Sequence, residues 1–228
     1  MSLSRLAPSH PDQAADAFIL AGGRSTRMGQ DKALIRFNGS PLIQHAIQLF
    51  QSVGLNPSIA GARSDLSSFA PVIADSRSHP GLGPLSGICA ALDSTAARYA
   101  VFLPVDLPML APSLISYLLH YAQVTASAVT LASIGGFVET FPVVIDRAAV
   151  PSLRTSLGSG DRKCLTAFRT ASAAIQAPFS VLSIEVLLQA GQVAHSNGLP
   201  TSAWFLSIND SGNLATAEAL AKRHLQLS

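Results

Sequence analysis

Short apolar segments alternate with helix-like patterns along most of this chain, and no other feature constrains its fold as strongly. The apolar segments are residues 17–21, 57–62, 71–74, 99–105 and 127–133. Runs of this kind are typical of strands that are buried on both faces of a parallel sheet. Strands that alternate with helices predict an α/β fold, here a three-layer, Rossmann-like, mostly parallel sheet with helices on both faces.

Helix signals fill the intervals between these segments. The first predicted helix lies within 40–54, with Ser40 as its N-cap and Pro41 at its first helical position. Further helices are predicted at 84–95 and 111–123. In the second half we expect an extended segment at 137–146, helices at 148–160 and 163–172, either a strand or a helix at 180–191, a strand at 203–208 and a helix at 213–226.

Length and composition favour one domain. The chain has 228 residues, of which 48% are hydrophobic and 12% charged, so it can bury one large core. We expect a single domain from 17 to 228 after a flexible lead of residues 1–16. The lead lacks the apolar core of a signal peptide, and no run approaches the roughly 18 apolar residues of a membrane helix. With only Cys89 and Cys164, which predict buried thiols, the chain is expected to be cytoplasmic and not bound to a membrane.

Positive charge is concentrated in one segment. The net charge of +2 comes without a basic stripe, which excludes nucleic acid as a partner. Yet Arg24, Arg27, Lys32 and Arg36 follow two glycines directly after the first apolar segment. Glycines let backbone N–H groups approach an anion, and several cations can hold a triphosphate. The spacing differs from that of a P-loop. The segment therefore predicts a triphosphate site, with a solvated surface turn as the alternative.

Asp106 directly follows the most apolar segment, 99–105. In open α/β sheets, ligands bind beyond the carboxyl ends of the strands. A carboxylate in such a place is costly without a partner, and Mg²⁺ shared with substrate phosphates would supply one. The alternative is an Asp that caps a helix or forms a turn. Asp75, after 71–74, is a weaker candidate of the same kind, and His79 lies in the loop that follows it.

The segment "LAGGRSTRMGQDKAL", residues 20–34, closely resembles the signature of the molybdenum cofactor guanylyltransferases. This family belongs to the larger nucleotidyltransferase group, whose fold is that of the nucleotide-diphospho-sugar transferases. Further similar segments are 38–46, 83–92, 104–110, 160–163 and 205–220. The resemblance thus covers most of the chain.

The resemblance implies a function and a set of site residues. The implied reaction transfers GMP from GTP to the terminal phosphate of molybdopterin, with Mg²⁺ as cofactor and with molybdoenzyme maturation proteins as partners. It implies nucleotide binding by Leu20, Ala21, Gly22, Gly23, Arg24, Lys32, Asp75 and Asp106, catalytic roles for Arg27, Lys32 and Asp106, Mg²⁺ binding by Asp106, and a place on the second-substrate side for Arg162, Lys163 and Asn209.

Three departures from the family pattern accompany these matches. Ala60 and Ala62 stand in a segment where the family has asparagine, Phe141 stands where it has histidine before a proline, and Ser207 replaces the first asparagine of an N-x-N motif. Two alternatives therefore remain open. One is a cytidylyltransferase of the same fold, although Gly23 and the Asp31-Lys32 pair favour the guanine enzyme. The other is a non-catalytic module that binds a nucleotide or a pterin.

Overall fold

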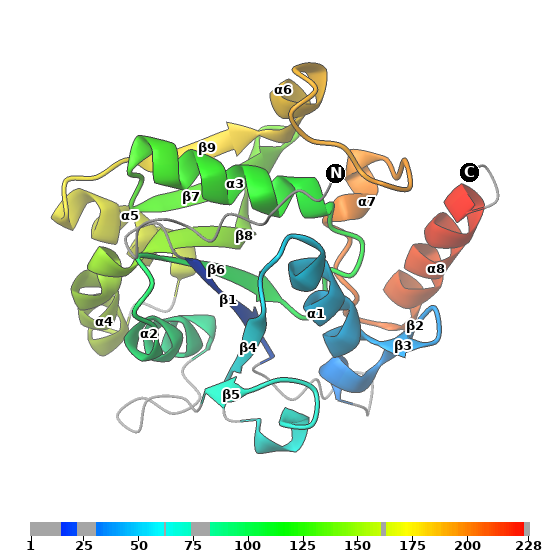
Figure 1. Ribbon diagram of the computed structural model, residues 1–228, viewed down its shortest axis with the longest axis horizontal. Helices are drawn as coiled ribbons and strands as arrows, with labels where there is room; N and C mark the ends of the chain where they lie inside the picture. Colours follow the sequence, from blue (N-terminus) through cyan, green and yellow to red (C-terminus); the bar gives the residue numbers. More distant parts are fainter. Residues whose placement is uncertain (1–14, 22–30, 62, 74–82, 161–162, 226–228) are drawn as a thin grey trace, which may run out of the picture.

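A seven-stranded sheet forms the middle layer of the molecule (Figure 1). The computed structural model describes residues 15–21, 31–61, 63–73, 83–160 and 163–225. The strands, in their spatial order, are β5 (Val72–Ile73), β4 (Pro57–Ala60), β1 (Ala15–Leu20), β6 (Tyr99–Pro104), β8 (Phe137–Asp146), β7 (Val129–Ile134) and β9 (Phe179–Ser183).

Most neighbouring strands run parallel, as predicted. β1 pairs in parallel with β4 and with β6, β4 pairs in parallel with β5, and β7 pairs in parallel with β9. Only β8 runs against its neighbours, β6 and β7. A tight turn at Gly135 and Gly136 joins β7 to β8, and both glycines have positive φ angles, 57° and 81°, which a two-residue hairpin turn requires.

Helices cover both faces of the sheet, which confirms the three-layer prediction (Figure 1). One face packs against α1 (Leu42–Ser52), α3 (Pro112–Thr125) and α6 (Ile184–Gln189), and the core on this side extends to α7 (Thr201–Trp204) and α8 (Ser211–Leu225). The other face packs against α2 (Pro84–Ser94), α4 (Val150–Gly158) and α5 (Cys164–Ala174). Because side chains alternate along a strand, Ile19 of β1 points into the first core and Phe18 into the second.

The start of α1 differs from the prediction. Ser40 is not the N-cap, because it pairs with Phe37 in a small antiparallel hairpin of β2 (Arg36–Phe37) and β3 (Ser40–Pro41). Pro41 is the N-cap itself, and the helix begins at Leu42. The signal for the hairpin was the Asn38-Gly39 pair, since both residues have the positive φ angles that such a turn needs.

In three other segments the structure differs from the prediction or decides between alternatives that the prediction left open. The strand expected at 203–208 is wrong: α7 ends at Trp204, and residues 205–208 form no strand. Residues 180–191, for which a strand and a helix were both open, contain most of β9 and then α6, because Ser183 caps α6 by accepting from the Val186 N–H. β1 begins at Ala15, so Ala15 and Asp16, expected in the N-terminal lead, belong to the sheet. The rest of that lead lies outside the described residues.

Both cysteines are buried, as predicted, and neither forms a disulfide in the described part of the chain. They lie in the core formed with α2 and α5, and burial raises the pKa of Cys89 to about 11. Among the helices of the described residues, none is long and apolar enough to cross a membrane.

Replacing Phe168 with alanine is expected to lower the free energy of unfolding by about 3–5 kcal/mol. Phe168 lies on α5, its side chain is fully buried, and its removal leaves a cavity against the sheet. Phe137→Ala is the matched control, since Phe137 is 77% exposed and its loss should change stability by no more than about 0.5 kcal/mol. Urea denaturation measures both. Equal stability of the two variants would contradict this account of the core.

Candidate active site

The carboxyl ends of three parallel strands meet at one edge of the sheet and support the candidate active site. Leu20 at the end of β1 lies beside Ala60 of β4 and Pro104 of β6. Just beyond the strands, the Ala21 N–H donates to the Ala60 carbonyl at 3.4 Å, and the Val105 N–H donates to the Leu20 carbonyl at 3.3 Å. Ala21 and Val105, the first residues after β1 and β6, are thereby held at the edge where ligands bind in open α/β sheets.

Four side chains form a closed polar network at this edge. The Lys32 ammonium makes an ion pair with Asp106 and donates to the Asn209 side-chain oxygen at 2.5 Å. The Ser207 hydroxyl donates to the Asp106 carboxylate at 2.5 Å and accepts from the Asn209 amide at 2.9 Å. The Lys32 and Asp106 side chains are 20% and 16% exposed. We refer to these four residues as the Lys32 network.

Local structure positions each member of the network. Lys32 is the first residue of the 3-10 helix η2 (Lys32–Leu34), which Asp31 caps by accepting from the Ala33 N–H. Asp106 lies in the turn after β6 and caps no helix, since the N-cap of α3 is Ala111. The chain after α7 reaches the same place because the Ile208 N–H donates to the Asp106 carbonyl at 3.0 Å. Ser207 and Asn209 flank that bond.

The Lys32 network has groups that can bind a phosphate and groups that can bind a metal cation. Its cation can be offered to a phosphate, because an ammonium is a strong donor to anionic oxygens. Its side-chain oxygens, from Asp106 and Asn209, already converge on one cation, the Lys32 ammonium. Oxygen donors of this type are the ligands that Mg²⁺ takes in proteins, and it needs only one or two carboxylates when phosphates supply the rest. Within the described residues there is no cluster of three or more His, Cys, Asp and Glu.

Arg63 is a site residue that the sequence predictions missed. It lies just after β4, and its guanidinium pairs with Asp31, donates to the Ala21 carbonyl at 3.2 Å and donates to Asp65 at 2.8 and 3.0 Å. Hydrogen bonds to Asp65 and Asp31 raise the pKa of Arg63 against the opposing effect of burial. Its position after the second predicted strand was the only available signal, since residues after strands line the site in this fold.

The predicted site residues are distributed unevenly over the described part of the chain. Leu20, Ala21, Lys32, Asp106 and Asn209 lie together at the strand ends. Lys163 is exposed, on a separate element, as the N-cap of α5. The predictions for Gly22, Gly23, Arg24, Arg27, Asp75, His79 and Arg162 lie outside the described residues.

Arg36, the last cation of the basic segment, is engaged elsewhere. It is exposed on β2, and its guanidinium donates to the Gly39 carbonyl at 2.6 Å within the hairpin. A departure named above, Ser207, lies in the network itself and bonds to Asp106. The other departure at a strand end, Ala60, contributes its backbone carbonyl to Ala21 rather than a side chain.

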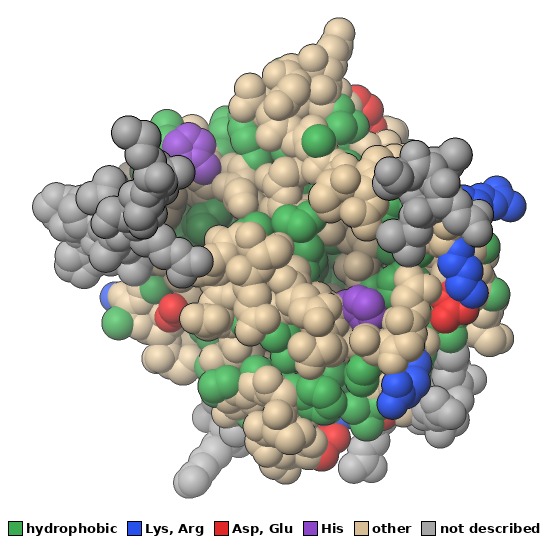
Figure 2. Space-filling model, turned by 45° about the vertical axis from the view of Figure 1, so that its right-hand side comes forward, with side chains coloured by type: hydrophobic (Ala, Val, Ile, Leu, Met, Phe, Trp, Pro, Cys, Tyr) green, Lys and Arg blue, Asp and Glu red, His purple; other side chains and the backbone are tan. Residues whose placement is uncertain are grey.

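A small cavity of about 190 Å³ lies near the network. Its lining residues are Phe37, Asn38, His45, Pro108, Met109, His195, Asn197, Leu199 and Ala221. It brings together the β2–β3 hairpin, the turn after Asp106 and α8. Figure 2 shows the side of the molecule that carries the hairpin and α8, where hydrophobic and uncharged polar groups cover most of the described surface.

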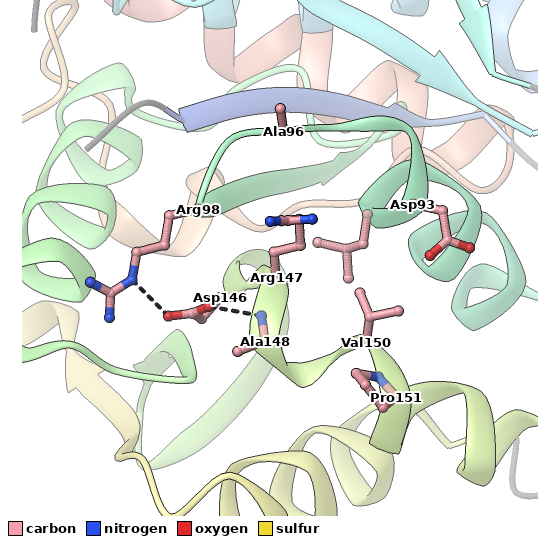
Figure 3. Close-up of a pocket in the computed structure, with 9 residues that line it drawn as sticks. Asp93, Ala96, Arg98, Asp146, Arg147, Ala148, Val150 and Pro151 are labelled. Atoms are coloured by element: carbon pink, nitrogen blue, oxygen red, sulfur yellow. Dashed lines mark hydrogen bonds and ion pairs between the residues drawn. The ribbon is translucent and has the colours of Figure 1, made fainter. Parts of the chain in front are cut away.

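A larger cavity of about 490 Å³ lies at the opposite end of the sheet (Figure 3). Arg98, just before β6, and Asp146, at the end of β8, form an ion pair there at 3.0 Å. Asp146 also caps the 3-10 helix η4 (Arg147–Ala149) by accepting from the Ala148 N–H. Because Asp106 follows the other end of β6, this cavity is separate from the candidate active site.

Comparisons with known proteins give a consistent picture. A family model described as the MobA-like NTP transferase domain matches residues 17–174. The molybdenum cofactor guanylyltransferase of Vibrio atlanticus is 34% identical over 155 residues, covering 66% of this chain and 78% of that protein. The enzyme of the same name from Shewanella putrefaciens is 38% identical over 160 residues, with the same coverage of 66% and 78%.

Solved structures of similar fold point the same way. Molybdopterin-guanine dinucleotide biosynthesis protein A of Archaeoglobus fulgidus has a TM-score of 0.72 at 20% identity and covers 91% of this chain and 99% of its own. The 2-C-methyl-D-erythritol 4-phosphate cytidylyltransferase of Thermus thermophilus has a TM-score of 0.60 at 15% identity, with coverage of 90% and 98%. At these identities the likeness shows the fold, which agrees with the predicted class. The family match includes Lys32 and Asp106 and ends before Ser207.

Proposed function

The chain belongs to the MobA-like NTP transferase family, and from this premise we propose that it transfers GMP from GTP to the terminal phosphate of molybdopterin. The products are the guanine dinucleotide form of the cofactor and pyrophosphate. Relatives named molybdenum cofactor guanylyltransferase support the choice of substrates. The observation that carries the proposal is the pairing of Lys32 with Asp106 at the carboxyl ends of β1 and β6, inside the matched segment.

The reaction asks the protein mainly for position and charge. An oxygen of the molybdopterin phosphate attacks the α-phosphorus of GTP, a new P–O bond forms, and the bond to the β-phosphate oxygen breaks. The attacking phosphate is already an anion, so no strong base is needed. Repulsion between two polyanions is the main obstacle, and fixed positive charge lowers it.

Lys32 is proposed to supply part of that charge. Without substrate, its ammonium is held by Asp106 and Asn209. GTP brings several anionic phosphate oxygens, and together these can compete for the ammonium with the single Asp106 carboxylate and the neutral Asn209 amide oxygen. The ammonium would then neutralise the departing pyrophosphate, while Asn209 stays beside it on the second-substrate side.

Asp106 is proposed to hold Mg²⁺, because its carboxylate and the Asn209 oxygen already converge on one cation. The metal would stabilise the negative charge that develops on the phosphates. Ser207 keeps the carboxylate in place by donating to it at 2.5 Å. With Asp106 engaged in this way, Lys32 would be free to bond to the phosphates.

The remaining roles are proposals from the family pattern. Nucleotide binding is assigned to Leu20, Ala21, Gly22, Gly23, Arg24 and Asp75, catalysis to Arg27, and the second-substrate side to Arg162 and Lys163. We also propose that the chain acts as one domain from β1 onward, which begins at Ala15 instead of residue 17, that the protein works in the cytoplasm, and that molybdoenzyme maturation proteins receive its product.

Incubation with GTP, Mg²⁺ and molybdopterin is expected to yield the guanine dinucleotide and pyrophosphate, which chromatography and a coupled phosphate assay detect.

Thermal-shift titration separates the alternatives, because a nucleotide that binds the folded state at 100 times its Kd adds about 2.7 kcal/mol of stability. GTP should raise the melting temperature more than CTP or ATP. A shift with CTP alone would favour the cytidylyltransferase, and GTP binding without product would favour a non-catalytic module.

A further inference from the structure

Arg63 bonds to Ala21 and Asp31, the two residues that flank the segment 22–30 in the sequence. Its Nη1 donates to the carbonyl of Ala21, the residue before this segment, at 3.2 Å. The same nitrogen donates to Asp31, the residue after it, at 3.2 Å, and Nη2 completes a two-pronged ion pair with that carboxylate. One guanidinium therefore holds Ala21 and Asp31 together.

The burial of these partners indicates which contact matters. The Arg63 side chain is 11% exposed and that of Asp31 is 25% exposed, whereas that of Asp65 is 58% exposed. A pair with an exposed carboxylate is screened by water and contributes little. A planar, two-pronged Arg–carboxylate pair that is shielded from water is stronger and also fixes geometry.

Asp31 links the ion pair with Arg63 to the short helix that carries Lys32. Its carboxylate accepts from the Ala33 N–H at 2.9 Å, which starts the 3-10 helix whose first residue is Lys32. When Arg63 orients Asp31, it also orients the first turn of that helix. Two contacts therefore connect Arg63 to Lys32, whose ammonium bonds to Asp106: the ion pair of Arg63 with Asp31 and the hydrogen bond from the Ala33 N–H to Asp31.

We propose that Arg63 is a positioning residue that holds Ala21 and Asp31 together and thereby sets the placement of Lys32 for nucleotide phosphates. The identity of the nucleotide in this inference rests on the proposed function. The positioning role itself, which we call the clamp, rests on the contacts of Arg63 with Ala21 and Asp31. It acts through Ala21 and Asp31 and needs no contact with the substrate.

The test compares Arg63→Ala with Arg98→Ala. Both arginines make an ion pair beside the sheet, but Arg98 pairs with Asp146 at the far end, away from the site. GTP affinity is measured by calorimetry in Mg²⁺ without molybdopterin, so that no turnover occurs. Arg63→Ala is expected to weaken GTP binding by about 10- to 100-fold, which lies in the range of coupling between residues that share one ion-pair network. Arg98→Ala should bind GTP as the wild type does.

Three further variants separate positioning from simple stabilisation. Asp31→Asn keeps an oxygen for the Ala33 N–H but removes the charge that Arg63 holds. In a double-mutant cycle, its effect on GTP affinity should largely disappear in the Arg63→Ala background, whereas Asp65→Asn should have little effect alone. Arg63→Lys should recover only part of the affinity, since an ammonium lacks the planar fork that bonds to Ala21 and Asp31 together.

Backbone amide exchange gives a readout that does not depend on the nucleotide. In Arg63→Ala, the amides of Ala21 and Ala33 should exchange faster by NMR, and in Arg98→Ala they should not. If the wild type binds CTP instead of GTP, the proposed function fails while the same comparison with CTP still tests the clamp. Unchanged affinity together with unchanged exchange, and only a lower melting temperature, would overturn it.

Discussion

Replacing Asp106 with alanine is expected to lower the rate of pyrophosphate release from GTP and molybdopterin at least about 1000-fold, equivalent to about 4 kcal/mol of transition-state stabilisation. The substitution removes the carboxylate that accepts from Ser207 and pairs with Lys32. Under the proposed function, it also removes the carboxylate that holds Mg²⁺. Initial rates at saturating GTP measure the effect.

The fold should survive this substitution, because Asp106 lies in a turn and its side chain is 16% exposed. The Ile208 N–H bonds to the Asp106 backbone carbonyl, which alanine retains. Asp106→Asn should lose nearly as much activity, since the amide keeps the shape but not the charge. Asp93→Ala is the matched control: Asp93 pairs with Arg154 beside the far cavity, and its loss should change the rate by about twofold or less.

Circular dichroism and the melting temperature show whether each variant is folded. Full turnover by folded Asp106→Ala would remove Asp106 from the metal site and from the reaction. A loss of activity that added Mg²⁺ restores would instead indicate that the metal has further ligands.

Lys32→Ala is expected to reduce kcat/KM for GTP by about 100- to 1000-fold, as the loss of one fixed group that stabilises developing charge does in other enzymes. The ammonium bonds to Asp106 and Asn209 in the structure and is proposed to turn to the phosphates when GTP binds. Because the charge on the leaving group grows during the reaction, kcat should fall as well as KM rise. Steady-state kinetics with varied GTP separates the two effects.

Arg36→Ala is the control for this prediction, since Arg36 comes from the same basic segment but bonds to the Gly39 carbonyl in the hairpin. Its kcat/KM should stay within about twofold of the wild-type value, as expected for an exposed substitution. Lys32→Arg should retain part of the activity, because it keeps the charge but not the shape. If Lys32→Ala and Arg36→Ala behave alike, the ammonium has no special role.

Much of the fold could be predicted because the decisive signals are local. Residues 137–146 were expected to be extended, and β8 has these bounds. Residues 180–191 carry both strand and helix signals, and the structure uses both in succession, divided at Ser183. A strand was wrongly predicted at 203–208 because this run is apolar. Its Trp204 side chain packs in the core that includes α1 and α3, and the run does not join the sheet.

The site could be predicted only in part. Lys32 and Asp106 follow predicted strands, and the fold class places such residues together. Arg63 went unrecognised because its partners, Ala21 and Asp31, are 42 and 32 residues away along the chain. Ser207 was noted only as a departure from a family pattern, and its bond to Asp106 spans 101 residues.

The sequence by itself determined the class of the fold, and it singled out Lys32 and Asp106, which the structure brings together as an ion pair. Periodic apolar segments specify strands and helices because burial depends on the spacing of side chains along one element. Only the tertiary structure decided how charge is balanced at the strand ends. Strand order and chain reversal bring Arg63 to Asp31. They also bring Ser207 to Asp106 and Asn209 to Lys32. A partner for a partly buried charge must be close in space, and closeness in sequence does not ensure this.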